Sequence, residues 1–515
     1  MNGNVCCRYL RFVHWTTWIG MIFYAFYIVV QKRAEIISAL FKEARWFCRV
    51  HNCRQRDHGD SEWEAIVSLV WAMRFWLLAH AALAQLIAAL ASQLLQPFYV
   101  FYSLLFATMC FPRDVWVKGI IMLAATFLAV WLRRRSVVYA VGFALVADAT
   151  IDIPLKPRLS SSPTVIGSTW SHEASVYFVG WHVLRCVSVT ADILDGSPRG
   201  QPRGVFHTCL RALAYLLYFP GLIIGPVTNY DDFMKEPHRP SAWNHKRLLE
   251  FLVRCCRLVA RFFIMEAFLR WAYVRSALLA PRWYLAQSGW TLAGLVWLTS
   301  LQFYLKYNFA YGLSSLFFWM DGVYERHDLR PLCTVRIHTA SNTWRYLYKP
   351  VVGGHWTPWR RFLGTSATFS FVLLWHTLQP HMVVWTLTNY FLVMAEMACV
   401  TLIDSAPVRS WRAKYSSPVA EWVLKGVFCA FSLIGTFGSC FFFLTDYEIA
   451  GGTLEKLLVF PVPLLPVLLG LYCKAQVAMD IFDWEEARRT QKANGQRKKE
   501  TETSGSSSSP NTGTA

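Results

Sequence analysis

The chain has 515 residues, of which 55% are hydrophobic and 16% are aromatic, whereas only 16% are charged. A soluble globular protein carries about 25% charged residues, so the composition argues against a soluble enzyme or a soluble binding domain. The net charge is +19, but Lys and Arg stand in short clusters beside apolar runs, as in loops that contact anionic headgroups. Because no nucleic-acid-binding motif accompanies this charge, the expected partner is the lipid bilayer and not a nucleic acid.

In chain order, the first apolar run covers residues 9–31. This run is too long for a cleaved signal peptide and lacks the small residues of a cleavage site. A helix needs roughly 20 apolar residues to cross a bilayer. Further apolar segments lie near 65–95, 98–111, 115–132, 136–150, 174–194, 205–228, 250–279, 287–318, 362–378, 382–404, 419–446 and 455–478. The sequence therefore predicts an all-α polytopic membrane protein with roughly ten to twelve transmembrane or re-entrant helices.

The apolar pattern stops after Trp484. We expect one membrane domain over residues 1–487 and a disordered polar tail over residues 488–515, which is too polar to bury anything. The fourteen cysteines are scattered without CxxC or metal-finger spacing. A disulfide framework or a zinc site is therefore not expected.

Two stretches carry residues that an ordinary membrane helix does not need. The stretch Tyr218–Lys235 places Pro220, Gly225 and Pro226 in apolar surroundings. From backbone geometry alone, this composition is more typical of a kinked helix end than of a functional site. The apolar segment 371–378 carries His376. An imidazole loses hydration in lipid, so it should face a protein interior or a wet cavity. On these grounds alone, a buried structural histidine is the more frequent interpretation and a chemical base is the alternative.

The order of motifs resembles a known family. Tyr-Phe-Pro and Gly-Pro are followed by FYLKYNFAYGLSSLFFWMDGV, LC, WRY, PVVGG, LGTSATFSFVLLWH and TNYFLVMAE, between Tyr218 and Glu396. This pattern resembles the membrane-bound O-acyltransferase superfamily, and within it the hedgehog acyltransferase branch. The resemblance implies an enzyme with an acyl-CoA tunnel across the membrane. It would transfer palmitate from palmitoyl-CoA to the N-terminal cysteine amine of a hedgehog-type secreted protein, in the endoplasmic reticulum membrane, with the Golgi as a second location.

The resemblance also implies roles for individual residues. His376 matches the catalytic histidine, and an imidazole with an unperturbed pKa of about 6.5 is suited to deprotonate an incoming amine. Cys333 matches a cysteine that binds the iron of haem b, for which a thiolate is a competent ligand. The residues expected at the acyl-CoA site or tunnel are Trp344, Arg345, Tyr346, Trp375 and Asn389.

Other polar residues near this site have plainer explanations. Asp321 most simply caps or charges a helix end. Asn389 and Glu396 stand about two turns apart on one helix face. They line the tunnel or hydrogen-bond neighbouring helices, and we slightly favour the second.

One departure from the family matters for activity. Enzymes of the branch carry an aspartate shortly after Trp-Arg-Tyr, but here Trp344-Arg345-Tyr346 is followed by Leu, Tyr, Lys and Pro. The interval to His376 is shorter by about a dozen residues, close to three helical turns at about 1.5 Å per residue. Thr377 also replaces the glycine that commonly follows the histidine.

Three explanations of this departure stay open. The segment that bears the aspartate is missing from this sequence, or Asn342 takes the role as asparagine does in sister branches, or the protein has lost catalysis. The loss of catalysis would make the protein a non-catalytic relative that binds acyl-CoA or partners and regulates palmitoylation. A separate second alternative is an O-acyltransferase acting on a lipid or sugar hydroxyl.

Overall fold

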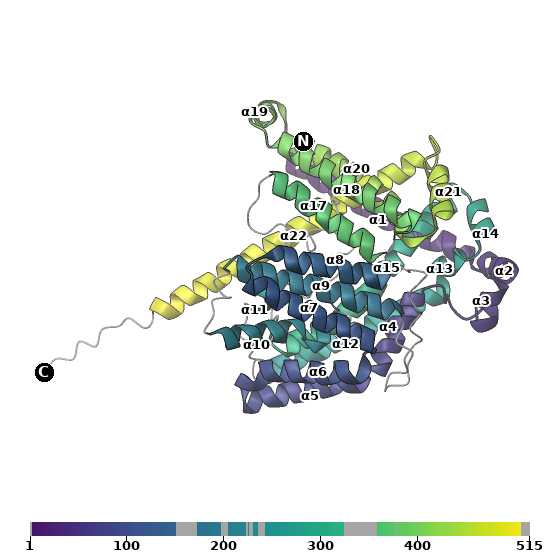
Figure 1. The fold of residues 1–515 in the computed structure, drawn as a ribbon. Coiled ribbons are helices and arrows are strands. Elements are labelled where there is room, and N and C mark those ends of the chain that lie inside the picture. Colours follow the sequence, from purple (N-terminus) through teal and green to yellow (C-terminus); the bar gives the residue numbers. More distant parts are fainter. Residues whose placement is uncertain are drawn as a thin grey trace.

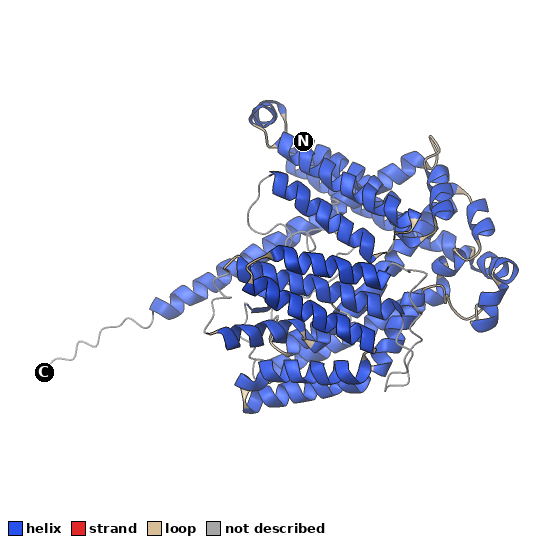
Figure 2. Cartoon of the chain, in the orientation of Figure 1, coloured by secondary structure: helices blue, strands red, loops and turns tan. Residues whose placement is uncertain are grey.

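The computed structural model describes residues 3–150, 172–196, 204–222, 225, 230–234, 243–323, 358–376 and 378–505. Every regular element within these ranges is a helix (Figure 2). The predicted all-α fold class is thereby confirmed.

The helices run in the following order. They are α1 Gly3–Gln31, α2 Arg33–Glu43, α3 Arg45–Val50, α4 Ser61–Ala72, α5 Arg74–Leu90, η1 Ser92–Leu94, α6 Leu95–Cys110, α7 Arg113–Trp131, α8 Arg135–Thr150, α9 His172–Leu194, α10 Val205–Leu216, η2 Phe219–Gly221, α11 Tyr230–Met234, α12 His245–Trp271, α13 Val274–Ala277, α14 Pro281–Ala286, α15 Gly289–Met320, α17 Pro358–Trp375, α18 Pro380–Ile403, α19 Ala406–Tyr415, α20 Pro418–Leu444, α21 Tyr447–Leu457 and α22 Leu464–Gly505.

The helices form two groups that meet at α15 and α17 (Figure 1). In the first group, α7, α8 and α9 pack against one another, and α10 packs against α6 and α9. In the second group, α18 packs on α20, α20 on α22, α22 on α1 and α1 on α15. Helix α17 contacts α8 in the first group and α18 in the second. The C-terminal end of α17, which precedes His376, therefore lies in a helix that joins the two groups.

Five described helices are long and apolar enough to cross a membrane, or six if α4 and α5, which are bent by 54°, form one broken span. Other apolar helices are shorter. Helices α6 and α8 have 16 residues each, about 24 Å at 1.5 Å per residue, whereas the hydrocarbon core is about 30 Å thick. Large side chains on the crossing helices face outward, for example Trp131 at 78% and Phe431 at 68% exposure, as expected where lipid is the solvent.

Helix α22 continues to Gly505, into the stretch for which the composition predicts a disordered tail. Its apolar part ends near Trp484, and the charged and amide residues beyond it are good helix formers.

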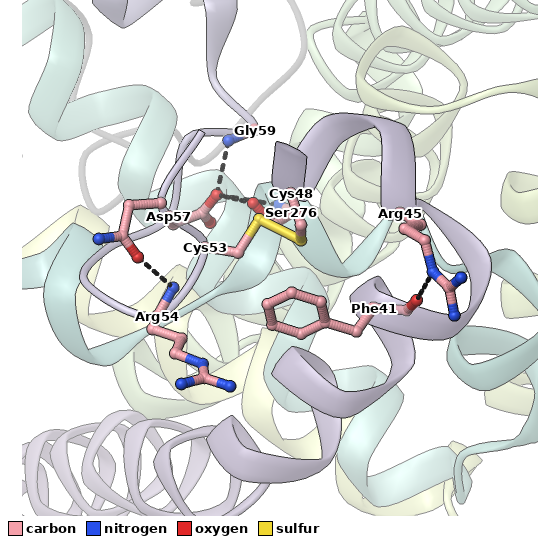
Figure 3. Close-up of a disulfide and its surroundings, with 9 residues drawn as sticks. Phe41, Arg45, Cys48, Cys53, Arg54, Asp57, Gly59 and Ser276 are labelled. Carbon is pink, nitrogen blue, oxygen red and sulfur yellow. Dashed lines mark hydrogen bonds between the residues drawn. A yellow bond between two sulfur atoms is a disulfide. The ribbon is translucent and has the colours of Figure 1, made fainter. Parts of the chain in front are cut away.

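The segment between α1 and α4 contains a disulfide, although the sequence predicts no disulfide framework (Figure 3). Cys48, in α3, forms a disulfide with Cys53, and their Cα atoms are 5.3 Å apart. The spacing of five residues matches no familiar motif, so the pairing depends on how the chain turns after Val50. Just beyond it, Asp57 accepts hydrogen bonds from the backbone N–H groups of Gly59, Arg275 and Ser276 and from the Ser276 hydroxyl. Burial raises the pKa of Asp57.

The start of α4 is fixed to α15 by a buried ion pair. Asp60 caps α4 by accepting from the backbone N–H of Trp63 at 3.0 Å. The same carboxylate pairs with the Lys306 ammonium at 3.0 Å and accepts from the Gln302 amide at 3.1 Å. Burial opposes ionisation of Asp60, but the Lys306 and Arg275 charges outweigh it and hold the pKa of Asp60 below its usual value. Asp60 and Lys306 are each 4% exposed.

We predict that Asp60→Ala lowers the thermal unfolding midpoint of the detergent-purified protein, at a cost of about 3 kcal/mol, because it removes a helix cap and one partner of a buried pair. Asp404→Ala, at an exposed helix end, is the control and should cost less than about 0.5 kcal/mol. Because the pKa of Asp60 is lower in the folded state, its contribution is complete at neutral pH and is lost as the pH falls through the folded-state value. Equal midpoints for the two variants would contradict the prediction.

Candidate functional site

His376 follows the last residue of α17, and its backbone N–H donates to the Val372 carbonyl at 3.0 Å. The side chain is half-buried and is enclosed by three aromatic rings. The centroid of its ring lies 5.6 Å from that of Trp375, 5.4 Å from that of Trp385 and 5.2 Å from that of Phe443. Trp385 belongs to α18 and Phe443 to α20, so the imidazole lies among side chains of three helices.

Trp375 orients the histidine because its own position is closely fixed. Its indole N–H donates to the Val176 carbonyl of α9 at 3.2 Å, and its ring meets Trp181 edge-on at 5.2 Å. Gly180, also on α9, provides the space for the indole, because a Cβ at this position would lie 2.2 Å from the Trp375 ring. A glycine–tryptophan contact between α9 and α17 thus supports the residue next to His376.

Asn389 lies one helical turn after Trp385 on α18 and is buried. Its amide donates to the Trp385 carbonyl and to the Ser439 hydroxyl of α20, both at 2.8 Å. Further along the same helices, the Ser432 hydroxyl donates to the Glu396 carboxylate. Asn389 and Glu396 therefore both hydrogen-bond α18 to α20. The sequence analysis slightly favours such bonds between helices over a position along the acyl-CoA tunnel.

The other residues predicted for this site fall outside the described ranges. They are Cys333, Asn342, Trp344, Arg345 and Tyr346. Within the described ranges, no group of three or more His, Cys, Asp or Glu side chains could hold a metal ion.

A second histidine-centred cluster, which the sequence analysis did not identify, is buried between α5 and the end of α15. His80 lies 3.1 Å from the Asp321 carboxylate, and the Tyr218 hydroxyl donates to the same oxygen at 2.5 Å. Both His80 and Asp321 are 1% exposed or less. Asp321 is the C-cap residue of α15, as the sequence suggests, but its carboxylate bonds His80 and the tyrosine of the Tyr-Phe-Pro motif.

The two histidines differ in what they can do chemically. His80 is fully enclosed, with six aromatic rings within about 6 Å, and it joins three segments of the fold. His376 is only partly enclosed by the described residues. His80 lies in the apolar run 65–95, just as His376 lies in an apolar run. The same sequence pattern, an imidazole among apolar residues, therefore points to His80 as well.

Comparison with known proteins shows which families the chain resembles. The model of the MBOAT, membrane-bound O-acyltransferase family matches residues 204–441, which include His376. Protein-cysteine N-palmitoyltransferase HHAT of Mus musculus is 25% identical over 453 residues, which cover 82% of this chain and 88% of that protein.

The chain is similar to membrane-bound O-acyltransferases over this region. Two further relatives of this acyltransferase match shorter stretches. Protein-cysteine N-palmitoyltransferase Rasp of Drosophila melanogaster is 23% identical over 53% of this chain and 55% of its own length. Membrane-bound O-acyltransferase GUP2 of Saccharomyces cerevisiae is 23% identical over 40% of this chain and 34% of its own length. The chain thus spans about half of Rasp and a third of GUP2, and the resemblance to the palmitoyltransferase branch extends beyond the family model.

We predict that Gly180→Ala destabilises this acyltransferase, because the added methyl group collides with the Trp375 indole and overpacking costs about 1–3 kcal/mol. Gly451→Ala is the matched control, since nothing lies within 4 Å of a Cβ at that helical position and Ala is favoured there by about 0.5–1 kcal/mol. Thermal unfolding midpoints of the two variants should move in opposite directions. A midpoint for Gly180→Ala at or above that of the wild type would show that Trp375 is not tightly held.

Proposed function

We propose that this acyltransferase moves palmitate from palmitoyl-CoA to the N-terminal cysteine amine of a hedgehog-type secreted protein. The observation that carries the proposal is the similarity to mouse HHAT over 82% of the chain and 88% of that relative. Rasp, which is also a protein-cysteine N-palmitoyltransferase, gives further support.

His376 is the base in this proposal. The acceptor amine arrives as an ammonium ion, and the imidazole Nε2 or Nδ1 takes one proton from it. The free amine attacks the thioester carbonyl, so that a C–N bond forms and the C–S bond breaks. The imidazolium gives its proton to the departing CoA thiolate, and the second proton that the amine nitrogen loses as the amide forms passes to water. Atoms and charge balance without a further reactant.

The surroundings of His376 suit this chemistry. Trp375, Trp385 and Phe443 present apolar ring surfaces to the imidazole. Such a shell keeps water away from a thioester and prevents hydrolysis from competing with the amine. Trp344, Arg345 and Tyr346 are proposed, through the resemblance, to contact palmitoyl-CoA.

The proposed location is the endoplasmic reticulum membrane. The protein carries apolar helices long enough for several crossings. The Cys48–Cys53 disulfide supports a lumenal position for the loop after α1, because disulfides persist in oxidising compartments and are rare in the cytosol. A secreted acceptor protein would pass on the same side.

O-acylation of a lipid or sugar hydroxyl is the second candidate function, and the match to GUP2, a membrane-bound O-acyltransferase, favours it. The two candidates differ in the nucleophile. Palmitoylation of a peptide requires a free N-terminal amine, whereas transfer to a lipid or sugar is indifferent to that amine.

We predict that purified protein transfers labelled palmitate from palmitoyl-CoA to a hedgehog N-terminal peptide, and that His376→Gln reduces the rate by about 10²–10⁴-fold, as expected for loss of a general base. His245→Gln, at an exposed position, is the control and should keep the wild-type rate.

Each alternative gives a different result in the same assay. If the peptide accepts no palmitate but an added lipid or sugar does, the enzyme is an O-acyltransferase. Well-folded protein without any transfer would identify a non-catalytic relative. A peptide acetylated at its N-terminus must be inert if the amine is the nucleophile.

A further inference from the structure

A short helix between two candidate membrane spans carries only basic charge. Helix α19 contains Arg409, Arg412 and Lys414 and no acidic residue. We propose that these three residues, together with Lys425 at the start of α20, form a surface that binds the anionic headgroups of phospholipids. This α19 surface is independent of the proposed function, because its binding requires neither an acyl donor nor an acceptor.

Helix α19 lies at a membrane face, because it joins two helices that are each long enough to cross the bilayer. The span Pro380–Ile403 of α18 precedes it, and the span Val419–Leu444 of α20 follows it. The ring of Trp385, near the start of α18, packs at 4.6 Å against Phe443, near the end of α20, so the two helices run antiparallel. Figure 1 shows α19 beyond the opposite ends of these two helices. With ten residues, α19 is too short to span and forms the turn of the hairpin.

The disulfide loop after α1 lies at the other end of α20. The Arg275 guanidinium donates to the carbonyl of Leu444, the last residue of α20, at 2.7 Å, and the Arg275 backbone N–H donates to the Asp57 carboxylate at 2.9 Å. Asp57 lies four residues after Cys53 of the disulfide. Helix α20 has 27 residues, which extend about 40 Å and exceed the hydrocarbon thickness of about 30 Å. The α19 surface and the disulfide loop are therefore on opposite faces of the membrane.

The basic side chains of α19 are accessible. Arg409 and Lys414 are exposed. The Arg412 side chain is 39% exposed where it pairs with Glu421 at 3.2 Å, and such an exposed pair is weak. The Arg409 guanidinium donates to the backbone carbonyl of Asp404 at 2.6 Å, which carries no formal charge. The cations of α19 thus retain the capacity to bind an anion.

The charge balance of the hairpin turn favours an anionic partner. Residues 401–426 contain four basic and two acidic side chains, which give a net charge of +2. Phospholipid phosphates are the anions at this depth, and phosphatidylserine and phosphatidylinositol make the cytosolic leaflet the more anionic one. The proposed lumenal position of the disulfide loop assigns α19 to the cytosolic leaflet.

Two long side chains suit a helix that lies in the headgroup region. Trp411 is 60% exposed, and tryptophan is enriched at the level of the headgroups because its ring is apolar and its N–H is polar. Lys425 is exposed near the start of the α20 span. A lysine at the end of a spanning helix extends its ammonium to the lipid phosphates. A free phosphate ion would have no use for these apolar contacts.

The first test titrates the detergent-purified protein with dioctanoyl phosphatidylserine or dioctanoyl phosphatidylcholine and follows the thermal unfolding midpoint. A ligand that binds the folded protein raises the midpoint, so phosphatidylserine should act at lower concentration than phosphatidylcholine. The triple variant Arg409→Gln, Arg412→Gln, Lys414→Gln should need at least about 10-fold more phosphatidylserine for the same shift, because each basic residue contributes to headgroup attraction.

The matched control removes three exposed charges from the other face of the membrane. The variant Arg45→Gln, Arg49→Gln, Arg54→Gln changes the net charge by the same amount and should titrate like the wild type. An equal loss in both triple variants would mean that net charge alone governs binding, and it overturns the proposal. Equal responses of the wild type to the two lipids overturn it as well. Inorganic phosphate at the same concentration should give no shift, and a full shift would make the site one for an adventitious ion only. If the α19 triple variant does not fold, Arg409→Gln replaces it and should weaken binding less, in the same direction.

The second test checks the face of the membrane on which α19 lies. Lys414 and Lys42 are both exposed, and Lys42 lies six residues before Cys48. In sealed microsomes, a membrane-impermeant N-hydroxysuccinimide ester added outside should label Lys414, whereas Lys42 should react only after detergent opens the vesicles. Peptide mass spectrometry distinguishes the two lysines. Protection of Lys414, or equal labelling of both before detergent is added, would overturn the assignment of α19 to the cytosolic leaflet.

Discussion

The buried ammonium of Lys306 is the constraint around which the centre of the protein is built. An unpaired lysine in an apolar helix is costly, and a buried ion pair is tolerated only where its geometry and hydrogen bonds are complete. Lys306 meets this requirement by drawing Asp60 and Glu62 onto α15. The first turn of α4 is consequently fixed against α15, and Asp57 just before it is fixed against Ser276. These contacts tie the N-terminal loop to the helix that contacts both helical groups.

The two histidine clusters differ in how far the protein encloses them. His80, Asp321 and Tyr218 join α5, the end of α15 and the Tyr-Phe-Pro turn, and their enclosure leaves no room for a substrate. His376 stands at the end of α17 in a partly open aromatic shell, supported from behind by Trp375 and Gly180. Tyr218 of the Tyr-Phe-Pro motif thus belongs to the first cluster, whereas His376 in the second is the proposed base.

The sequence predicts the helical fold well, because the fold class depends on local composition, whereas the role of His376 stays a prediction carried by ordered motifs. Among the described residues, five or six helices are long and apolar enough to span a membrane, whereas the sequence predicts roughly ten to twelve transmembrane or re-entrant helices. An apolar run does not reveal where a helix ends. The sequence misses the Gly180–Trp375 contact and the Cys48–Cys53 disulfide. The first joins residues far apart in sequence, and the second has no characteristic spacing.

A structure with a bound thioether analogue of palmitoyl-CoA, in which the reactive carbonyl is replaced by a methylene group, would test whether His376 marks the reaction centre. The analogue sulfur should lie beside the His376 imidazole, within the shell formed by Trp385 and Phe443, with its acyl chain running into the membrane. A sulfur atom bound at the His80–Asp321 cluster, or anywhere that the imidazole of His376 cannot reach, would contradict the assignment of His376 as the base.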